Sequence, residues 1–288
     1  MVKCALCREE SDLELSHIIP KFVFRKIKMN SPTGYMRIFN NPDLRIQDGD
    51  KLELLCGSCE DRFSTAETDF ANKIFHPYQD SNIQDFIYDS WMNYFITSVN
   101  WRTLYLDLIG FVKDGNIKME YVEILIDAEK TMRDFLLGKR LDLSNIENHI
   151  LFFDEIKDTT EKIKELRPQS FIRSSAFGYT FIAKDYKSVY VYANLAGILI
   201  ITIIKKCEIE EWRNTIVNMG QGEIKQPVYI KSPLPDDLFK LIEEANAAEM
   251  SLEQQEKLKE RIKGNPDKLI KSKYAQFVKM DLRLLDEE

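Results

Sequence analysis

The feature that most constrains this chain is a pair of short cysteine motifs near its N-terminus. Cys4 and Cys7 form one C-x-x-C pair. Cys56 and Cys59 form the other. Each such turn directs two sulfur atoms toward one point, so two turns supply the four ligands of a tetrahedral Zn²⁺. The stretch between the pairs is much longer than the roughly 15–20 residues of a short zinc ribbon, so the two motifs bracket a sizeable excursion of the chain.

Two disulfide bonds are the alternative use for these four cysteines. The chain starts at Met1 without a basic and then apolar leader of the kind that directs a protein to an oxidising compartment. We therefore expect a cytoplasmic protein whose four thiolates close the shell of a structural zinc ion. The fifth cysteine, Cys207, follows an apolar run without a partner motif and is expected to be a buried or idle thiol.

His17 lies between the two cysteine pairs, in a strand-like apolar stretch that Pro20 ends. Because four thiolates leave the metal no open position, this imidazole is a surplus group beside the site. A second short strand leads into Cys56, and apolar residues at helical spacing follow Cys59. Two strands that each carry a cysteine pair, followed by a helix, predict a treble-clef arrangement.

This order of motifs resembles the zinc-stapled form of the HNH (ββα-metal) endonucleases. The match covers about residues 1–75 and consists of C-x-x-C, then His-Ile-Ile-Pro, then Leu-Leu-C-x-x-C leading into a helix. The resemblance implies a metal-dependent nuclease in which His17 is the general base that activates water against a phosphodiester. The longer string from Ser16 to Glu67 also resembles uncharacterised bacterial proteins of similar length.

The sequence departs from the family pattern at three positions. Ser16 stands where the family has an acidic residue before the base. Lys51 follows Asp50 where the family has an asparagine, and Glu60 replaces a metal-binding histidine. Carboxylate oxygens bind Mg²⁺ or Mn²⁺, so Glu60 preserves a second, catalytic metal site. Glu67, two helical turns later on the same face, is the second candidate ligand.

The charge of the chain is acidic overall but unevenly distributed. A formal net charge of −7 counts against a uniformly basic nucleic-acid surface. Cations nevertheless gather between the cysteine pairs and just after the second one. We predict that seven of them contact nucleic-acid phosphates, namely Lys21, Arg25, Lys26, Lys28, Arg45, Lys51 and Arg62. The alternative is an ordinary solvated helix face.

The length of 288 residues and the apolar content of 44% predict an α+β protein with two domains. Residues 1–77 would form the zinc-stapled domain, its helix ended by His76-Pro77. Residues 78–288 would form the larger domain, with helices within 83–137, strands within 148–206 and C-terminal helices within 235–285. We expect an antiparallel sheet covered on one side by helices, with strands that include 171–172 and an apolar run at 195–204. That run is about half of the ~20 residues needed to cross a bilayer, so we expect no membrane partner.

Three functions are compatible with these observations. The first is a nuclease, acting on DNA rather than RNA, whose larger domain recognises a signal, partner or substrate as in effectors of bacterial anti-phage systems; this last step is analogy. The second is a zinc-stapled module that binds nucleic acid without cutting, which Ser16 and Lys51 favour because they weaken Mg²⁺ binding. The third is a scaffold that binds a protein partner or a second copy through the larger domain, which the acidic charge favours.

Overall fold

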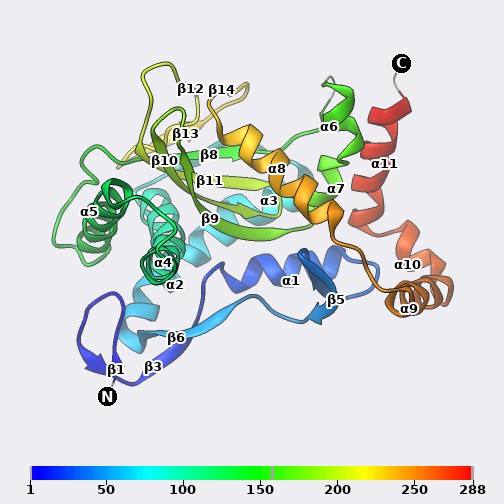
Figure 1. Ribbon diagram of the computed structural model, residues 1–288, viewed down its shortest axis with the longest axis horizontal. Helices are drawn as coiled ribbons and strands as arrows, with labels where there is room; N and C mark the ends of the chain where they lie inside the picture. The colour runs from blue at the N-terminus through cyan, green and yellow to red at the C-terminus, as the bar shows by residue number, and fades with distance from the viewer. Residues whose placement is uncertain (1, 157–158, 287–288) are drawn as a thin grey trace.

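The computed structural model describes residues 2–156 and 159–286. At its centre is a four-stranded sheet in the order β8-β11-β10-β9, with every neighbouring pair antiparallel (Figure 1). Its strands are β8 (Glu147–Phe152), β9 (Ala176–Ala183), β10 (Ser188–Leu195) and β11 (Ile198–Lys205). The predicted α+β class and the antiparallel sheet within 148–206 are confirmed.

Helices cover both faces of this sheet, so the prediction of one covered face is wrong. On one face lies α4 (Trp91–Asp114), which packs against β9, β10 and β11 and pairs with α5 (Met119–Leu136). On the other face α8 (Leu234–Ala247) crosses the strands, as Figure 1 shows. Successive strand residues point to opposite faces, and Val191 of β10 packs in the α4–α5 core while Tyr192 packs in the α8 core. All eight residues of β10 are therefore buried.

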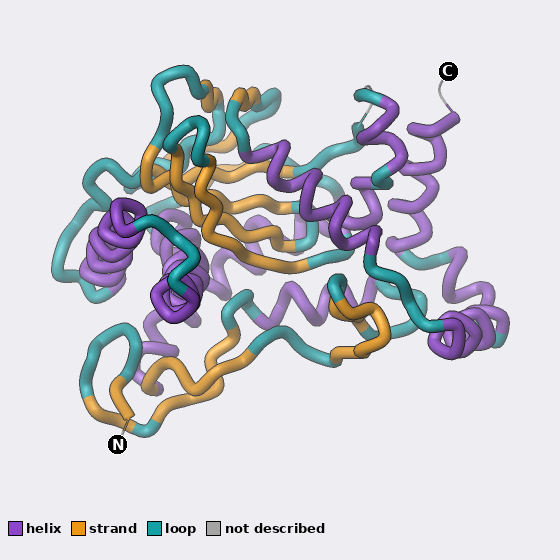
Figure 2. The backbone as a smooth tube through the Cα atoms, viewed as in Figure 1, coloured by secondary structure: helices purple, strands orange, loops and turns teal. Residues whose placement is uncertain are grey.

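The N-terminal segment, residues 2–70, lies beneath the sheet in the view of Figure 2. It contains six short strands and two helices. They are β1 (Val2–Lys3), β2 (Glu10–Ser11), β3 (Leu13–His17), α1 (Lys21–Asn30), β4 (Met36–Ile38), β5 (Asn41–Ile46), β6 (Lys51–Cys56) and α2 (Gly57–Phe70). Pro20 stands directly before α1, as expected for a residue that lacks an N–H and has a fixed φ. Strands β3 and β6 pair antiparallel, with Leu13 opposite Cys56 and His17 opposite Lys51.

The apolar core is continuous across the expected domain boundary at residue 77. Phe70 of α2 stacks on Phe95 of α4, with ring centroids 3.9 Å apart. Phe63 of α2 meets two rings of α4 edge to face: its centroid lies 6.2 Å from that of Tyr94 and 6.4 Å from that of Trp101. Stacked and edge-to-face aromatic pairs add stabilisation beyond the area they bury. Within the described residues, the N-terminal segment therefore shares its core with the rest of the chain through the α2–α4 contact.

His76-Pro77 does not end the helix that follows Cys59. After α2 the backbone widens into a π turn, η1 (Ala71–Phe75), and continues as α3 (His76–Ser81). Pro77 thus falls in the first turn of a new helical segment, where its missing N–H is tolerated. The helix ends instead at Asn82, whose φ of 53° places it in the left-handed region typical of helix C-termini.

Two further expectations on the larger domain are corrected. Residues 171–172 belong to helix α7 (Pro168–Arg173) and not to a strand. The run 195–204 is interrupted, because Ala196 and Gly197 have φ of 54° and 97° and form the tight turn between β10 and β11. Strand β7 (Phe86–Tyr88) comes before α4, so that helix begins at Trp91.

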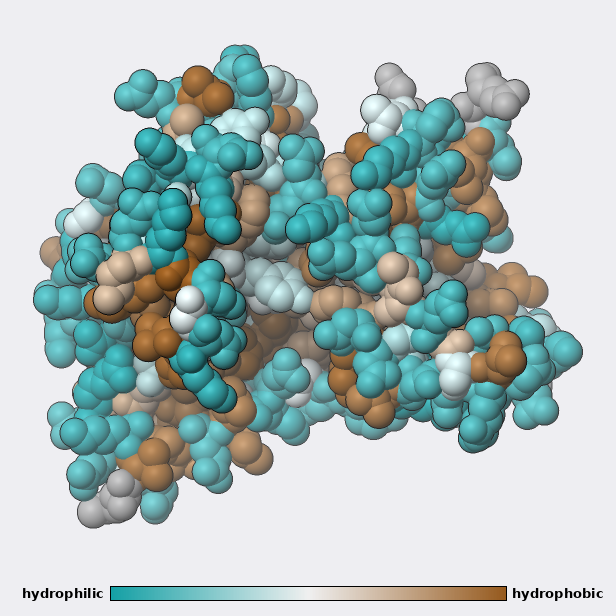
Figure 3. Space-filling model, in the orientation of Figure 1, coloured by the Kyte–Doolittle hydropathy of each residue, from teal (hydrophilic) through white to brown (hydrophobic). Residues whose placement is uncertain are grey.

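The remaining elements lie at the edges of the molecule. They are α6 (Glu161–Glu165), β12 (Glu211–Arg213), β13 (Gly222–Ile224), β14 (Tyr229–Lys231), α9 (Leu252–Lys263), α10 (Pro266–Ile270) and α11 (Lys273–Asp286). The expected helices within 235–285 are confirmed. Hydrophilic residues dominate the face drawn in Figure 3, with hydrophobic patches between them. Among the helices of the described ranges, none combines the length and the apolar character that a membrane crossing requires.

Candidate metal centre and its histidine

The four motif cysteines converge on one point. Their sulfur atoms all lie within 4.8 Å of one another, and the cysteines are free thiols with no disulfide between them. The Sγ atoms of Cys7 and Cys56, one from each pair, are 3.8 Å apart. A tetrahedral zinc ion with Zn–S bonds of about 2.3 Å would hold its sulfurs about 3.8 Å apart. The arrangement therefore fits one Zn²⁺ after a slight contraction, and the disulfide alternative is not supported.

Local backbone geometry shapes the first cysteine pair. The Cys4 N–H donates to Glu9 O at 2.9 Å, and the Arg8 N–H donates to Cys4 O at 3.0 Å, which closes the turn. Arg8 completes it with a φ of 69°. The Cys56 N–H donates to Cys4 Sγ at 3.4 Å and so ties the two pairs together. An N–H bonded to sulfur favours the thiolate form that a metal needs.

The second cysteine pair joins the end of β6 to the start of α2. Cys59 lies in the first turn of α2, where the helix dipole favours a thiolate. A hydrogen bond with Ser58 lowers the pKa of the Cys56 thiol to about 6, whereas burial raises the pKa of Cys59. Because adjacent thiolates repel each other, a cation is required to hold all four sulfurs deprotonated.

His17 ends β3, and its position is fixed from two sides. Arg102 of α4 donates from Nη1 to the main-chain oxygen of His17 at 2.7 Å. His17 Nε2 lies 3.2 Å from Asp48 Oδ1, within ion-pairing distance but without the alignment of a full hydrogen bond. The His17 side chain is 16% exposed, so the imidazole is held in place and still reaches solvent.

Asp48, in the loop before β6, supplies the carboxylate that pairs with His17. Gly49 allows its loop to pack closely on α1, since a Cβ there would lie 2.0 Å from the Phe24 ring. Asp48 Oδ2 also pairs with Lys51 Nζ at 3.0 Å. Burial alone would raise the pKa of Asp48, but the contacts with Lys51 and His17 outweigh it and lower the pKa to about 2. Asp48 is therefore ionised at neutral pH.

A pH-dependent contribution to stability follows from this carboxylate. The pKa of Asp48 is lower in the folded state than its ordinary value of 3.8, so its contribution is complete above about pH 4 and is lost as the pH falls toward about 2. We expect Asp48→Asn to be less stable than the parent at pH 6, and the difference to shrink steadily below pH 4. Urea unfolding of both proteins at several pH values measures this. A difference that is unchanged between pH 6 and pH 3 would contradict the assigned ion pair.

The two glutamates expected to bind a catalytic metal have different surroundings. Glu67 Oε1 accepts from Arg102 Nη2 at 2.7 Å, and the Arg102 side chain is 1% exposed, so Glu67 neutralises a buried guanidinium. Glu60 is partly buried, and its Oε1 has no hydrogen-bond partner. Among the residues that the structure describes, the four cysteines are the one cluster of three or more metal-ligand side chains. His17, Glu60 and Glu67 do not form a second.

In the structure, some of the cations predicted to contact phosphates are exposed, and others already have partners within the protein. Lys21, Arg25 and Arg62 are exposed. Lys28, one turn after Arg25 on α1, donates to the main-chain oxygen of Gln47 at 2.6 Å. Lys51 pairs with Asp48 as described. Arg45 lies on β5, where its guanidinium stacks on the Tyr35 ring.

Lys26 does not belong to this predicted phosphate-binding surface. Its residue is only 9% exposed, and its ammonium pairs with the Asp80 carboxylate of α3. A side chain that is buried and already paired with a carboxylate has no free charge for a phosphate.

Comparison with known protein families, with curated proteins and with solved structures finds no match to this chain.

Proposed function

We propose that this protein is a nuclease of the HNH type, with residues 1–75 as a zinc-stapled treble clef and His17 as the general base. The observation that carries the proposal is the His17–Asp48 pair at one end of the β3–β6 ribbon, whose other end carries Cys56 of the cysteine cluster and runs directly into α2. The zinc would be structural, because four thiolates leave it no position for water or substrate.

The pair provides the groups that water activation requires. Because Nε2 lies 3.2 Å from Asp48 Oδ1, Nδ1 is the nitrogen left to accept a proton from water. The water oxygen attacks phosphorus as its proton moves to His17, while the P–O bond to the leaving ester oxygen breaks and that oxygen takes a proton from solvent. The ionised Asp48 stabilises the imidazolium that forms, which then releases its proton to solvent. Arg102 acts as a positioning residue, because it holds the His17 backbone.

An oxygen-bound Mg²⁺ or Mn²⁺ would stabilise the charge on the leaving oxygen. The residues present fit such an ion only in part. Glu60 offers an unpartnered carboxylate oxygen, whereas Glu67 is occupied by Arg102. The occupied Glu67 favours the second candidate function, a zinc-stapled module that binds nucleic acid and does not cut it.

Either function needs a surface that holds phosphates. Lys21, Arg25 and Lys28 recur at helical spacing on α1, and Arg62 is exposed on α2. The three cations of α1 follow His17 closely along the chain and suit a polyanion that reaches the imidazole. A role in bacterial defence, and the preference for DNA over RNA, stay predictions.

The test is a cleavage assay on plasmid, single-stranded DNA and RNA in Mg²⁺ or Mn²⁺. We expect His17→Ala to lower the cleavage rate by about 10²–10⁴, the usual effect of losing a general base. Asp48→Asn should lower it less, because the base remains. The matched control is His76→Ala, which removes a half-buried histidine of α3 and should leave the rate unchanged.

Each outcome of this assay decides between the candidates. Cleavage that disappears with His17 supports the nuclease. Retention of nucleic acid without cleavage, weakened by Arg25→Gln, supports the binding module. A protein that neither cuts nor retains nucleic acid rules out both. Equal cleavage by the parent and His17→Ala assigns the activity to a contaminant and also counts against the proposal.

A further inference from the structure

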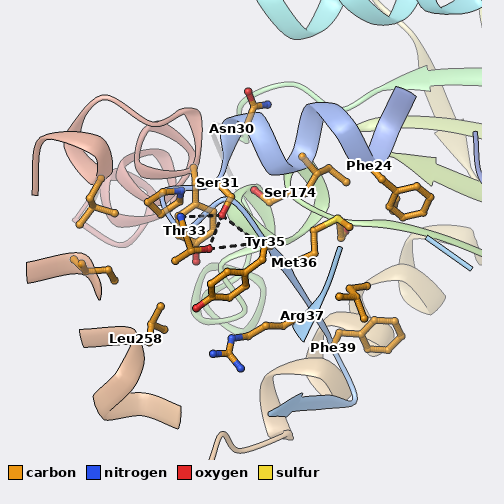
Figure 4. A pocket seen from close by; sticks show the side chains of 18 residues that line it. Phe24, Asn30, Ser31, Thr33, Tyr35, Met36, Arg37, Phe39, Ser174 and Leu258 are labelled. Carbon is orange, nitrogen blue, oxygen red and sulfur yellow. Dashed lines mark hydrogen bonds between the residues drawn. The ribbon is translucent and has the colours of Figure 1, made fainter. Parts of the chain in front are cut away.

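A cavity opens between α1, the β4–β5 hairpin and the C-terminal helices. Its volume is about 420 Å³, within the roughly 300–1,000 Å³ typical of small-molecule sites. Apolar side chains from distant parts of the chain line it, among them Phe24, Ile27 and Ile262. Figure 4 shows the Tyr35 ring among the lining side chains, with Arg37 beside it.

Three guanidinium groups surround the Tyr35 ring. The ring centroid lies 5.4 Å from Arg37 Cζ, 4.8 Å from Arg45 Cζ and 5.1 Å from Arg261 Cζ. These arginines come from β4, β5 and α9, so the tertiary fold brings them together. The negative face of an aromatic ring attracts a cation, but three cations around one ring also repel each other.

These three positive charges have no acidic partner within residues 2–156 and 159–286. Arg37 and Arg45 donate to the same neutral acceptor, Gln254 Oε1, at 3.4 and 3.1 Å, and Arg37 also donates to Pro42 O. Lys268 adds a fourth cation close by, since its Nζ would lie 3.7 Å from a Cβ on Gly34. Neutral acceptors orient guanidinium groups without cancelling their charge. The side of the cavity lined by Tyr35 and Arg37 is therefore cationic, with Arg45 and Arg261 against the same Tyr35 ring.

Polar atoms at the cavity also lack hydrogen-bond partners. Tyr35 is only 6% exposed, and its hydroxyl has no partner. The same holds for the buried Nε of Arg37 and the buried Oγ of Ser174, both of which belong to lining residues. Buried polar groups are nearly always paired in folded proteins, so unpaired groups around one cavity indicate a missing partner.

We propose that this cavity binds a phosphomonoester with an apolar body. The phosphate would accept charge-assisted hydrogen bonds from the arginines, whose planar forks match its oxygens, and the apolar body would contact the wall near Ile27 and Ile262. Tyr35 Oη would donate to a phosphate oxygen. A nucleoside monophosphate and an alkyl phosphate share this chemistry, and the experiment below distinguishes them.

Calorimetric titration of the full chain tests the proposal with AMP, dodecyl phosphate, dodecanol and inorganic phosphate. We expect AMP or dodecyl phosphate to bind one to one and more tightly than dodecanol or inorganic phosphate; whichever of the two binds identifies the body. Arg261→Gln and Arg45→Gln should each weaken this binding about tenfold, as expected for the loss of a charge-assisted hydrogen bond. The matched control is Lys263→Gln, an exposed cation of the same helix α9 for which the structure shows no contact with the Tyr35 ring, in contrast to Arg261.

Arg45 and Arg261 are exposed, so their replacement should leave the fold intact, and thermal unfolding of each variant checks this. Tyr35→Phe provides a second variant that keeps the ring and removes only the unpartnered hydroxyl; it should weaken binding several-fold. The proposal is overturned if neither AMP nor dodecyl phosphate binds saturably. It is also overturned if inorganic phosphate or dodecanol binds as tightly as the better of these two ligands, or if the two arginine variants bind that ligand as tightly as the parent does.

Discussion

Replacing Cys59 with serine is expected to abolish stoichiometric zinc binding and to unfold the N-terminal segment. Cys59 is 2% exposed, and it shares a buried cluster with Leu55, Phe63 and Trp101, so loss of the metal also disturbs the packing against α4. Structural zinc sites in small domains bind with about 10–16 kcal/mol at pH 7, and losing one ligand forfeits several of these. The zinc content measured by elemental analysis should fall from one zinc per chain to less than half a zinc per chain. Thermal unfolding should begin at a much lower temperature.

The fifth cysteine supplies the control for this experiment. Cys207 lies outside the cluster and is partly exposed, so Cys207→Ser should keep both the zinc content and the unfolding temperature of the parent. A Cys59→Ser protein that retains one zinc per chain and unfolds as the parent does would contradict the four-thiolate site.

Replacing Glu67 with glutamine is expected to destabilise the protein by about 3 kcal/mol, because it leaves a buried charge unpaired. Arg102 is 1% exposed and donates to Glu67 from Nη2 at 2.7 Å. Glutamine has the same shape and still offers an oxygen acceptor, so the loss reports mainly on charge. Urea unfolding at pH 7 measures the change in the free energy of unfolding.

A second carboxylate on the same helix provides the comparison. Asp69 pairs with Lys73 at 2.7 Å, but this pair is 29% and 54% exposed, so Asp69→Asn should cost less than about 1 kcal/mol. If Glu67→Gln abolished cleavage with no loss of stability, Glu67 would be a metal ligand after all, and its assignment as the partner of Arg102 would be wrong.

The spacing of the cysteines was sufficient to predict the metal centre, because ligand geometry is encoded in short local motifs. The helix after Pro20 was predictable for the same reason: a proline at the helix start is a local signal. The helix predicted after Cys59 exists, but it begins earlier, at Gly57, and continues past His76-Pro77. Its end was missed because the π turn before Pro77 has no simple pattern in the sequence.

Contacts between distant segments account for the errors at the site. Asp48 reaches His17 only because β3 and β6 pair in a register that sets His17 opposite Lys51, and no local motif reveals that register. Glu67 has the right helical spacing for a metal ligand, but its true partner, Arg102, comes from another helix. Spacing identifies which side chains share a face and leaves open what packs against that face.

The cationic cavity and the second covered face of the sheet were missed for a related reason. Arg37 and Arg45 lie on the neighbouring strands β4 and β5, but Arg261 comes from the distant helix α9. Of the three, only Arg45 was predicted as a site residue, for a nucleic-acid contact. Helix α8 was expected, but its place opposite α4 depends on the alternation of β10, whose residues are apolar or aromatic on both faces.

X-ray absorption spectroscopy at the zinc edge, on protein purified without added metal, tests the central claim most directly. The structure predicts one zinc per chain with four sulfur neighbours at about 2.3 Å and no nitrogen or oxygen neighbour. That result would leave the imidazole of His17 free to act on a substrate. A shell that contains nitrogen and loses it in His17→Ala would make His17 a zinc ligand, and the proposed base would not exist.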